Sequence, residues 1–193
     1  MSTAVDTDDA RERRVALLAE LFHHRWLVPV LAELSSSPAH RRVAPLLARL
    51  GVSRPSLRRT LDALFAAGLA RRNPGYGHPL RPEIDVLPRG AALGPWCVKT
   101  VATAESVGAG DVVRRKWSLA VLLLLGDGVE RFSELESAAP GLTARALAQA
   151  LARLEEASLV ERLVYDDRPP SVRYRPTKAG KRLAARAAAL PLK

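Results

Sequence analysis

Residues 116–125 read KWSLAVLLLL, and residues 25–34 read RWLVPVLAEL, 91 positions earlier. Each stretch opens with a basic residue and a tryptophan and continues with the apolar content of a buried helix. Three further landmarks recur at a spacing of 90, namely Gly51-Val52-Ser53 with Gly141-Leu142-Thr143, Ala67-Gly68-Leu69 with Ala157-Ser158-Leu159, and Gly90 with Gly180. A near-constant offset across four landmarks indicates that the chain contains two related units.

The order of elements within each unit predicts a winged helix. The helix at the tryptophan is followed by a short second helix, in the first unit from about Arg42 to Leu50, which Gly51 ends. A third helix follows, for which Ser53 is the expected N-cap and Pro55 suits the first turn. Two short strands around a turn and a closing helix complete the unit. The predicted fold class is therefore mainly α with small β-wings, an α+β fold of tandem winged helix-turn-helix domains.

The boundary between the units is predicted in residues 106–110, SVGAG, the one stretch with the composition of a flexible linker. This boundary divides the chain into an N-terminal winged-helix domain over residues 1–105, with leading and linker helices, and a C-terminal winged-helix domain over residues 111–193. The leading and closing helices, at about 10–22 and 179–190, are expected to pack on each other or on a second chain.

The charge of the chain favours an anionic partner. The formal net charge is +10, and the isoelectric point is about 10.7. Residues 1–110 and residues 111–193 each contain 15 Lys or Arg and 10 Asp or Glu, so the excess is not confined to a basic tail. Such a field favours nucleic acid first and acidic membrane surfaces second.

Other classes of protein lack support in the sequence. No apolar run approaches the roughly 20 residues of a membrane span, and the acidic start, residues 2–10, lacks the features of a signal peptide. Cys97, on the linker helix expected over 88–104, is the single cysteine, so a reducing cytoplasm is the expected location. The histidines are scattered without other ligands at metal-binding spacing, and neither a phosphate loop nor a nucleophile elbow occurs. We expect no metal, no cofactor and no enzymatic activity.

The third helix of each unit, over about 53–64 and 143–154, is the predicted recognition helix. Leucines at helical spacing bury one face of each helix and leave the other face to solvent. In the major groove an outward arginine can bind guanine O6 and N7, and an outward glutamine can bind adenine N6 and N7. The candidates for contact with DNA on these helices are Arg54, Ser56, Arg58, Arg59, Arg145, Gln149 and Arg153. The alternative is that these side chains only solvate a polar face.

The hairpins after these helices are the predicted wings. In the second wing, residues 171–175 read SVRYR and alternate, so that two arginines share one side of the strand. In the first wing a strand with an acidic outward side is expected at 83–86, after a longer tip at 73–82. Arginines on a wing would hold phosphates without reading the base sequence. The candidates are Arg71, Arg72 and Arg81 on the first wing and Arg173 and Arg175 on the second, with solvation alone as the alternative for each.

Motifs from helix, turn and wing follow one another in the second half. They are Lys116-Trp117-Ser118-Leu119, Glu130-Arg131-Phe132-Ser133-Glu134-Leu135, Pro140-Gly141-Leu142-Thr143, Leu154-Glu155-Glu156, Val160-Glu161-Arg162, and Tyr165 through Pro169-Pro170 to Tyr174 and Thr177. Over Arg114 to Leu190 the chain closely resembles the HxlR family of winged-helix regulators, whereas the first unit matches only in outline. The resemblance implies a DNA-binding transcriptional regulator whose members pair as homodimers. This chain would form the pair internally as a monomer or would dimerise further.

The sequence departs from the family pattern at two places. Ala148, Ala150 and Ala152 stand where the family tends to have hydroxyl or basic residues on and beside the recognition helix. The family's cysteine ahead of the Lys-Trp pair is absent, because residues 112–115 read VVRR. Redox sensing by the family's route is therefore not expected.

A second hypothesis is a protein that binds a small apolar molecule. If the two units pack face to face, Trp26, Trp96 and Trp117 would line an apolar pocket between them. Such a pocket would hold a hydrophobic effector that controls DNA binding, or it would serve a drug-sequestering protein with weak or no DNA binding. The alternative is that these tryptophans belong to the core. The expected partners are thus double-stranded DNA and a hydrophobic small molecule, and no membrane.

Overall fold

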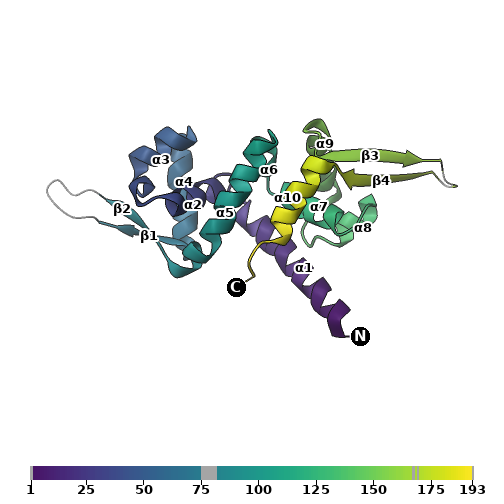
Figure 1. Ribbon diagram of the computed structural model, residues 1–193, viewed down its shortest axis with the longest axis horizontal. Helices are drawn as coiled ribbons and strands as arrows, with labels where there is room; N and C mark the ends of the chain where they lie inside the picture. The colour runs from purple at the N-terminus through teal and green to yellow at the C-terminus, as the bar shows by residue number, and fades with distance from the viewer. Residues whose placement is uncertain (1, 75–81, 167, 169, 193) are drawn as a thin grey trace. The chain divides into compact units, whose positions relative to one another are not determined.

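The structure, a computed structural model, describes residues 2–74, 82–166, 168 and 170–192. Helices dominate it, and its two sheets are antiparallel hairpins of two strands each, as Figure 1 shows. The chain divides into two compact units, which we name for their place in the sequence. The inner unit is His24–Ala102, and the outer unit combines Met1–His23 with Thr103–Lys193. The predicted fold class, mainly α with small β-wings, is confirmed.

The inner unit contains three α-helices, one 3-10 turn and a hairpin, followed by a helix that continues beyond its last residue. These elements are α2 (Leu27–Ser36), η1 (Pro38–His40), α3 (Val43–Leu50), α4 (Arg54–Ala66), β1 (Ala70–Asn73), β2 (Glu83–Val86) and α5 (Pro88–Ser106). Strand β2 occupies the residues predicted for it. The fully buried side chains of α2, α3 and α4 form the core, among them Leu31, Leu34, Leu46, Leu57 and Leu64.

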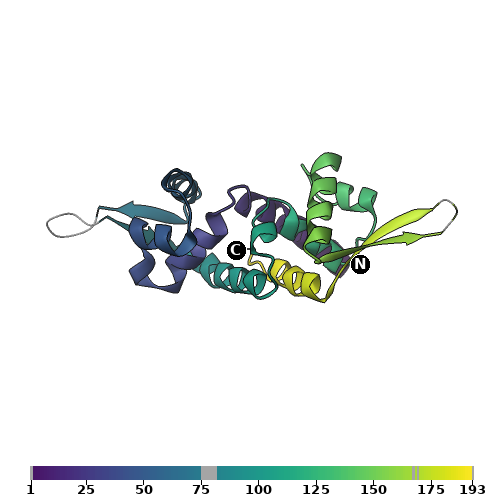
Figure 2. The same cartoon turned by 90° about the horizontal axis from the view of Figure 1, so that it is seen from above.

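The outer unit likewise has helices followed by a hairpin and a closing helix; its described residues include no 3-10 helix, and it adds the leading helix α1 (Ser2–Leu21) and the short helix α6 (Gly110–Val113). Its other elements are α7 (Ser118–Gly126), α8 (Phe132–Ser137), α9 (Ala144–Glu156), β3 (Val160–Tyr165), β4 (Ser171–Pro176) and α10 (Lys178–Ala188). Helix α7 is apolar on all sides and buried from Ser118 to Leu125, since other elements surround it. In Figure 2 the β3–β4 hairpin, in yellow-green, extends outward from the green helices α8 and α9.

Helix α1 packs within the outer unit, where it contacts α7 and α10. Val15, Leu18 and Leu21 are buried there, and the Arg14 Nε donates to the Leu190 carbonyl oxygen at 3.4 Å. The leading and closing helices therefore pack on each other, one of the two arrangements expected. The compact units accordingly differ from the ranges 1–105 and 111–193 in the placement of residues 1–23 and 103–105. Residues 1–23 belong to the outer unit because α1 finds its apolar partners late in the chain.

The predicted flexible junction is a tight turn between two helices. Helix α5 ends at Ser106 and α6 begins at Gly110. Gly108 has a φ of +67°, a left-handed conformation that glycine adopts at little cost, and Ala109 is buried. None of the helices in the described part of the chain is long and apolar enough to span a bilayer.

The local geometry around α4 recurs around α9 at a spacing of 90 residues. The hydroxyl oxygen of Ser53 accepts from the Ser56 amide, and that of Thr143 accepts from the Ala146 amide, so each helix has a side-chain N-cap. Each of the two helices is 13 residues long. The main chain of each hairpin is also tied back in the same way: the Ile84 amide donates to the Arg41 carbonyl at 2.8 Å, and the Tyr174 amide donates to the Glu130 carbonyl at 2.9 Å.

Candidate nucleic-acid interface

Helix α4 presents three arginines to solvent. Leu57, Leu61 and Leu64 bury the opposite face, which fixes the orientation of the helix on the inner unit. The three exposed arginines of α4 are Arg54, Arg58 and Arg59. None of them makes a hydrogen bond or ion pair with another described residue. They lie in the first half of the helix, and their guanidinium groups are available to an external anion.

Ser56 was predicted as a fourth contact on this helix, but it is engaged in the cap. Its hydroxyl accepts from the Ser53 hydroxyl at 3.0 Å, and its carbonyl oxygen accepts from the Thr60 hydroxyl at 2.9 Å. The Ser56 side chain is half-buried rather than exposed. Its polar groups thus stabilise the start of α4.

Helix α9 presents a weaker charge in the outer unit. Its outward stripe is Arg145, Gln149 and Arg153, all exposed and without a partner among the described residues. Leu147, Leu151 and Leu154 bury the other face, as the helical spacing predicted. Of the three alanines of this helix that depart from the family pattern, Ala148 and Ala152 are exposed and Ala150 is buried. The exposed face of α9 therefore carries more small side chains and fewer arginines than that of α4.

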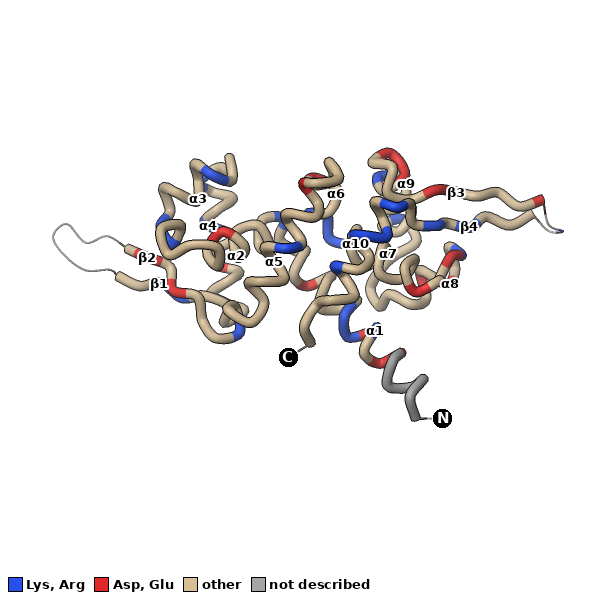
Figure 3. Tube along the Cα trace, viewed as in Figure 1, with Lys and Arg blue, Asp and Glu red and all other residues tan. Residues whose placement is uncertain are grey.

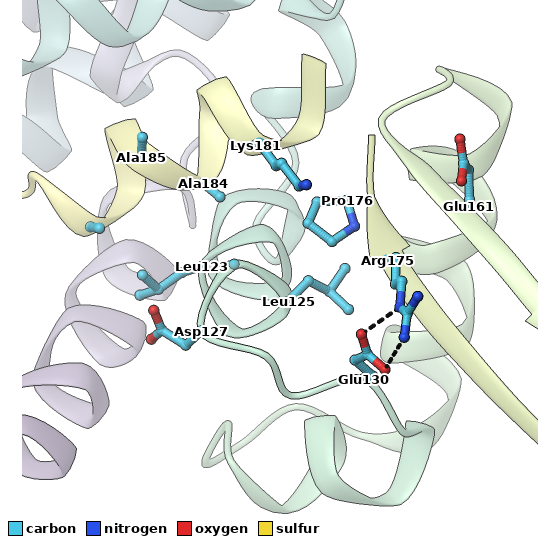
Figure 4. A pocket seen from close by; sticks show the side chains of 12 residues that line it. Leu123, Leu125, Asp127, Glu130, Glu161, Arg175, Pro176, Lys181, Ala184 and Ala185 are labelled. Carbon is cyan, nitrogen blue, oxygen red and sulfur yellow. Dashed lines mark hydrogen bonds and ion pairs between the residues drawn. The ribbon is translucent and has the colours of Figure 1, made fainter. Parts of the chain in front are cut away.

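The wing arginines of the outer unit are held by one carboxylate. Glu130 lies in the segment between α7 and α8, and Figure 4 shows it facing Arg175 of β4. The Arg175 Nε donates to Glu130 Oε1 at 2.6 Å, and its Nη2 donates to Oε2 at 3.4 Å. The hydrogen bond from Arg175 lowers the pKa of Glu130; the positive charges of Arg175 and Arg173 act in the same direction, and partial burial of Glu130 acts against them. The contact with Glu130 in turn raises the pKa of Arg175. The pair is therefore charged at neutral pH.

Arg173 belongs to the same group. Its Nη1 lies 3.8 Å from Glu130 Oε2, and its guanidinium lies 4.9 Å from the centre of the Tyr165 ring, a cation–π distance. Residues 171–174 are all half-buried, so the strand does not alternate cleanly between a buried and an exposed side. The two predicted phosphate clamps of this wing are thus paired within the protein, because a carboxylate far away in the sequence lies beside them.

Within its described residues the second wing also carries two unpaired arginines that are not among the predicted phosphate contacts. Arg162 on β3 and Arg168 beyond β3 are exposed and have no partner among the described residues. Figure 3 shows the acidic and basic positions interleaved over β3 and β4. Arg162 and Glu130 both lie in motifs that carried the family resemblance, but no pattern in the sequence indicated which cation is paired.

The first wing is divided in the same manner. The Arg71 Nε lies 3.2 Å from Asp85 Oδ2 on the neighbouring strand, and the Asn73 amide donates to the same carboxylate. Arg72 is exposed and has no partner among the described residues. Arg81 and most of the predicted tip lie outside the described residues. Of the predicted first-wing clamps within the described range, Arg72 is the one available to DNA.

Two of the three tryptophans occupy equivalent positions in the two units, and the third lies on a different helix. Trp26 and Trp117 are half-buried before α2 and α7, each with a cation over its ring, at 5.8 Å for Arg25 and 4.8 Å for Lys116. Trp96 is buried on α5, at 5% exposure. The shared apolar pocket for these rings stays a prediction. No tryptophan is among the described residues that line the cavity beside α10 or the cavity beside α4.

The outer unit contains a cavity of about 660 Å³ between α7, α10 and β4. Its apolar wall includes Leu123, Leu125 and Ala184, and its polar side includes Asp127 and the Glu130–Arg175 pair (Figure 4). Burial raises the pKa of Asp127, against the effect of Arg11 and Arg14. The lining holds both acidic and basic residues, and Glu130 and Arg175 are paired with each other, so the cavity does not indicate a ligand of one sign.

Comparison with known proteins places the similarity in the outer unit. The family described as HxlR-like helix-turn-helix matches residues 112–191. The uncharacterised HTH-type transcriptional regulator YvaP of Bacillus subtilis is 37% identical over 76 residues, which are 39% of this chain and 70% of that protein. The uncharacterised HTH-type transcriptional regulator YtfH of Escherichia coli is 35% identical over 78 residues, 40% of this chain and 62% of that protein.

An archaeal protein extends the comparison. The chain is 44% identical over 66 residues to an uncharacterised HTH-type transcriptional regulator of Methanothermobacter thermautotrophicus, covering 34% of this chain and 50% of that protein. The chain thus spans between half and 70% of the length of these three relatives. No solved structure matches the chain significantly.

Proposed function

The chain belongs to the HxlR-like helix-turn-helix family of transcriptional regulators, a DNA-binding and non-enzymatic class, and we propose that it reads duplex DNA with two recognition helices in one polypeptide. The family match includes α9, the proposed recognition helix of the outer unit, and α4 is its proposed counterpart in the inner unit. The prediction that the protein is a regulator and not an enzyme is confirmed at the level of the family.

The observation that carries this proposal is the exposed, unpaired arginine face of α4. Arg58 and Arg59 lie on a helix whose cap, length and buried face are those of α9, 90 residues later. A guanidinium without an internal partner can bind guanine edges or phosphates without first breaking an ion pair. The inner unit is therefore proposed as a second winged-helix domain with a DNA-contacting role of its own.

The proposed DNA site is unsymmetrical. Helix α4 offers arginines where α9 offers Arg145, Gln149 and exposed alanines, so the two helices would favour different base sequences. Two such helices in one chain would act as an internal pseudo-dimer. Light scattering measures whether two chains also pair with each other. As a regulator of transcription the protein would act in the compartment that holds the DNA, which we propose to be the cytoplasm.

The test is fluorescence anisotropy with labelled duplexes from the region upstream of the protein's own coding sequence. We expect Arg58→Ala and Arg59→Ala each to weaken binding by about 1–3 kcal/mol, or roughly 5- to 150-fold, as for an arginine in contact with a base. The matched control is Arg89→Ala, an exposed arginine whose Nη1 donates to the Ala67 carbonyl at the opposite end of α4.

The salt dependence of binding provides a second readout. Affinity should fall steeply as the salt concentration rises, because each phosphate contact releases bound counterions. Wild-type protein that binds no duplex at low salt, or binds with an affinity independent of salt, would show that the proposed function is wrong.

A further inference from the structure

A second cavity, of about 410 Å³, lies in the inner unit between α4 and the β1–β2 hairpin. Its apolar lining includes Leu57, Leu61 and Ile84, which are almost fully buried, and the half-buried Phe65. Val43, at the start of α3, also lines it and is 40% exposed, one of two large hydrophobic side chains so exposed in the described part of the chain. The volume lies in the range of sites for small organic molecules, about 300–1,000 Å³.

The polar lining of this cavity has an excess of positive charge. Arg54 and Arg58 come from α4 and Arg72 from β1, and none of the three has a partner among the described residues. Two acidic residues also line the cavity, but one of them, Glu83, is already bonded to Arg42 at 2.6 and 2.9 Å. Three guanidinium groups without an ion-pair partner in the described chain thus line the cavity beside its apolar residues, against one unpaired carboxylate, that of Asp62.

We propose that this cavity binds a small organic anion with an aromatic or otherwise apolar body, and that the bound anion excludes DNA from the inner unit. The apolar body would cover Val43, Phe65 and the leucines, and the anionic group would accept charge-assisted hydrogen bonds from the arginines. A neutral molecule of the same shape would desolvate guanidinium groups without pairing them, which costs free energy. A cation would be repelled.

Exclusion of DNA follows from shared residues. Arg54 and Arg58 line the cavity and are also proposed contacts of α4 with DNA. A guanidinium that donates to the bound anion has less charge and fewer donors left for a phosphate or a guanine, so each ligand weakens the binding of the other by the same factor. This second part rests on the proposed function, whereas the anion site itself does not.

The first experiment uses the fluorescent probe 8-anilinonaphthalene-1-sulfonate on the full chain, with its neutral analogue N-phenyl-1-naphthylamine for comparison. We expect one sulfonate probe bound per chain and at least tenfold weaker binding of the neutral analogue. Val43→Trp, which places bulk at the cavity without touching an arginine, and Arg72→Gln, which removes one guanidinium, should each weaken probe binding at least tenfold. A circular dichroism melt checks that both variants fold.

The control variant is Arg59→Ala, because Arg59 is exposed on the same helix but does not line the cavity. It should bind the probe as wild type does and lose DNA affinity, whereas Val43→Trp should keep DNA affinity and lose the probe. Equal binding of the neutral analogue, or unchanged probe binding by folded Val43→Trp and Arg72→Gln, would overturn the anion site.

The competition experiment separates the two parts of the inference. Saturating probe should release a labelled duplex from the wild type and should not release it from Val43→Trp. Probe binding with undiminished DNA affinity would overturn the exclusion and leave the site in place. If no duplex binds in the absence of probe, the proposed function fails, and the probe titrations still decide on the cavity.

Discussion

Arg175 and Glu130 form a two-point ion pair that joins the second wing to the segment ahead of α8, with nitrogen–oxygen distances of 2.6 and 3.4 Å across 45 residues of sequence. The same carboxylate lies 3.8 Å from Arg173. A DNA phosphate that approached this wing would therefore compete with a carboxylate already in place. The wing of the outer unit is partly neutralised by the protein itself.

Removal of the Glu130 charge should make the second wing bind DNA more strongly. In Glu130→Gln, Arg173 and Arg175 lose their ionic partner, and each new phosphate contact would add about 0.9 to the slope of log affinity against log salt. We expect tighter binding and a slope steeper by about 1 to 2 in anisotropy titrations at several salt concentrations. The matched control is Glu156→Gln, which removes the same charge from an exposed residue with no partner among the described residues. Weaker binding by Glu130→Gln would mean that Glu130 positions the arginines for DNA.

The same pair predicts a pH dependence of stability. The pKa of Glu130 is lowered in the folded protein, chiefly by the Arg175 hydrogen bond, from its ordinary value near 4.5. The stabilisation is therefore fully present above that ordinary value and is lost as the pH falls through the lower folded pKa. Urea unfolding should find the wild type more stable than Glu130→Gln at pH 7, with a difference that shrinks as the pH falls below the ordinary value near 4.5 and through the lower folded pKa. A difference that grows on acidification would contradict this account.

Two glycines at equivalent positions should tolerate no side chain. A Cβ on Gly90 would collide with the Leu69 carbonyl oxygen, and one on Gly180 would collide with the Leu159 carbonyl oxygen. Because backbone must move in both cases, Gly90→Ala and Gly180→Ala should each lower the free energy of unfolding by about 2 kcal/mol or more. Gly110→Ala is the control, since a Cβ there meets nothing within 4 Å. Urea denaturation of the three variants measures this, and equal losses in all three would count against it.

Cys97 should be unreactive in the folded protein. It is fully buried in the inner unit, and burial raises the pKa of its thiol to about 12. At pH 8 only about one thiol in ten thousand would then be ionised, and the thiolate is the reactive form. Native protein mixed with the thiol reagent dithiobis(nitrobenzoate) should release almost no thionitrobenzoate within minutes. Protein unfolded in urea should release one equivalent per chain. Rapid reaction of the native chain would instead indicate an accessible thiol.

Much of the fold was predictable because it is determined locally. Ser53 was predicted as an N-cap from its residue type, and Thr143 is its counterpart in the repeat. The caps that both residues form depend on atoms three residues away. The 13-residue helices α4 and α9 follow from leucines at helical spacing. The available arginines of α4 were predictable for the same reason, since helical spacing determines which face a residue occupies.

The rest of the candidate site depends on contacts between distant parts of the chain. Arg175 was predicted as a free phosphate clamp, but its partner Glu130 is 45 residues away, and spacing within one strand carries no information about it. The cavity beside α4 likewise needs side chains from α3, α4 and β2 together. The packing of α1 on α7 and α10 joins the first and last parts of the sequence, which composition and periodicity do not link.

That packing of α1 constrains the order in which the protein can fold as it is synthesised. Residues 24–102 form a compact unit and are made before residues 103–193, whereas α1 is made before both and must wait for α7 and α10. At about 5–20 residues per second the wait for α10 lasts roughly 10 to 30 seconds, during which the apolar face of α1 lacks this native partner. The inner unit is thus an insertion in the sequence of the outer unit, whose core can be completed only after α7 and α10 have been made.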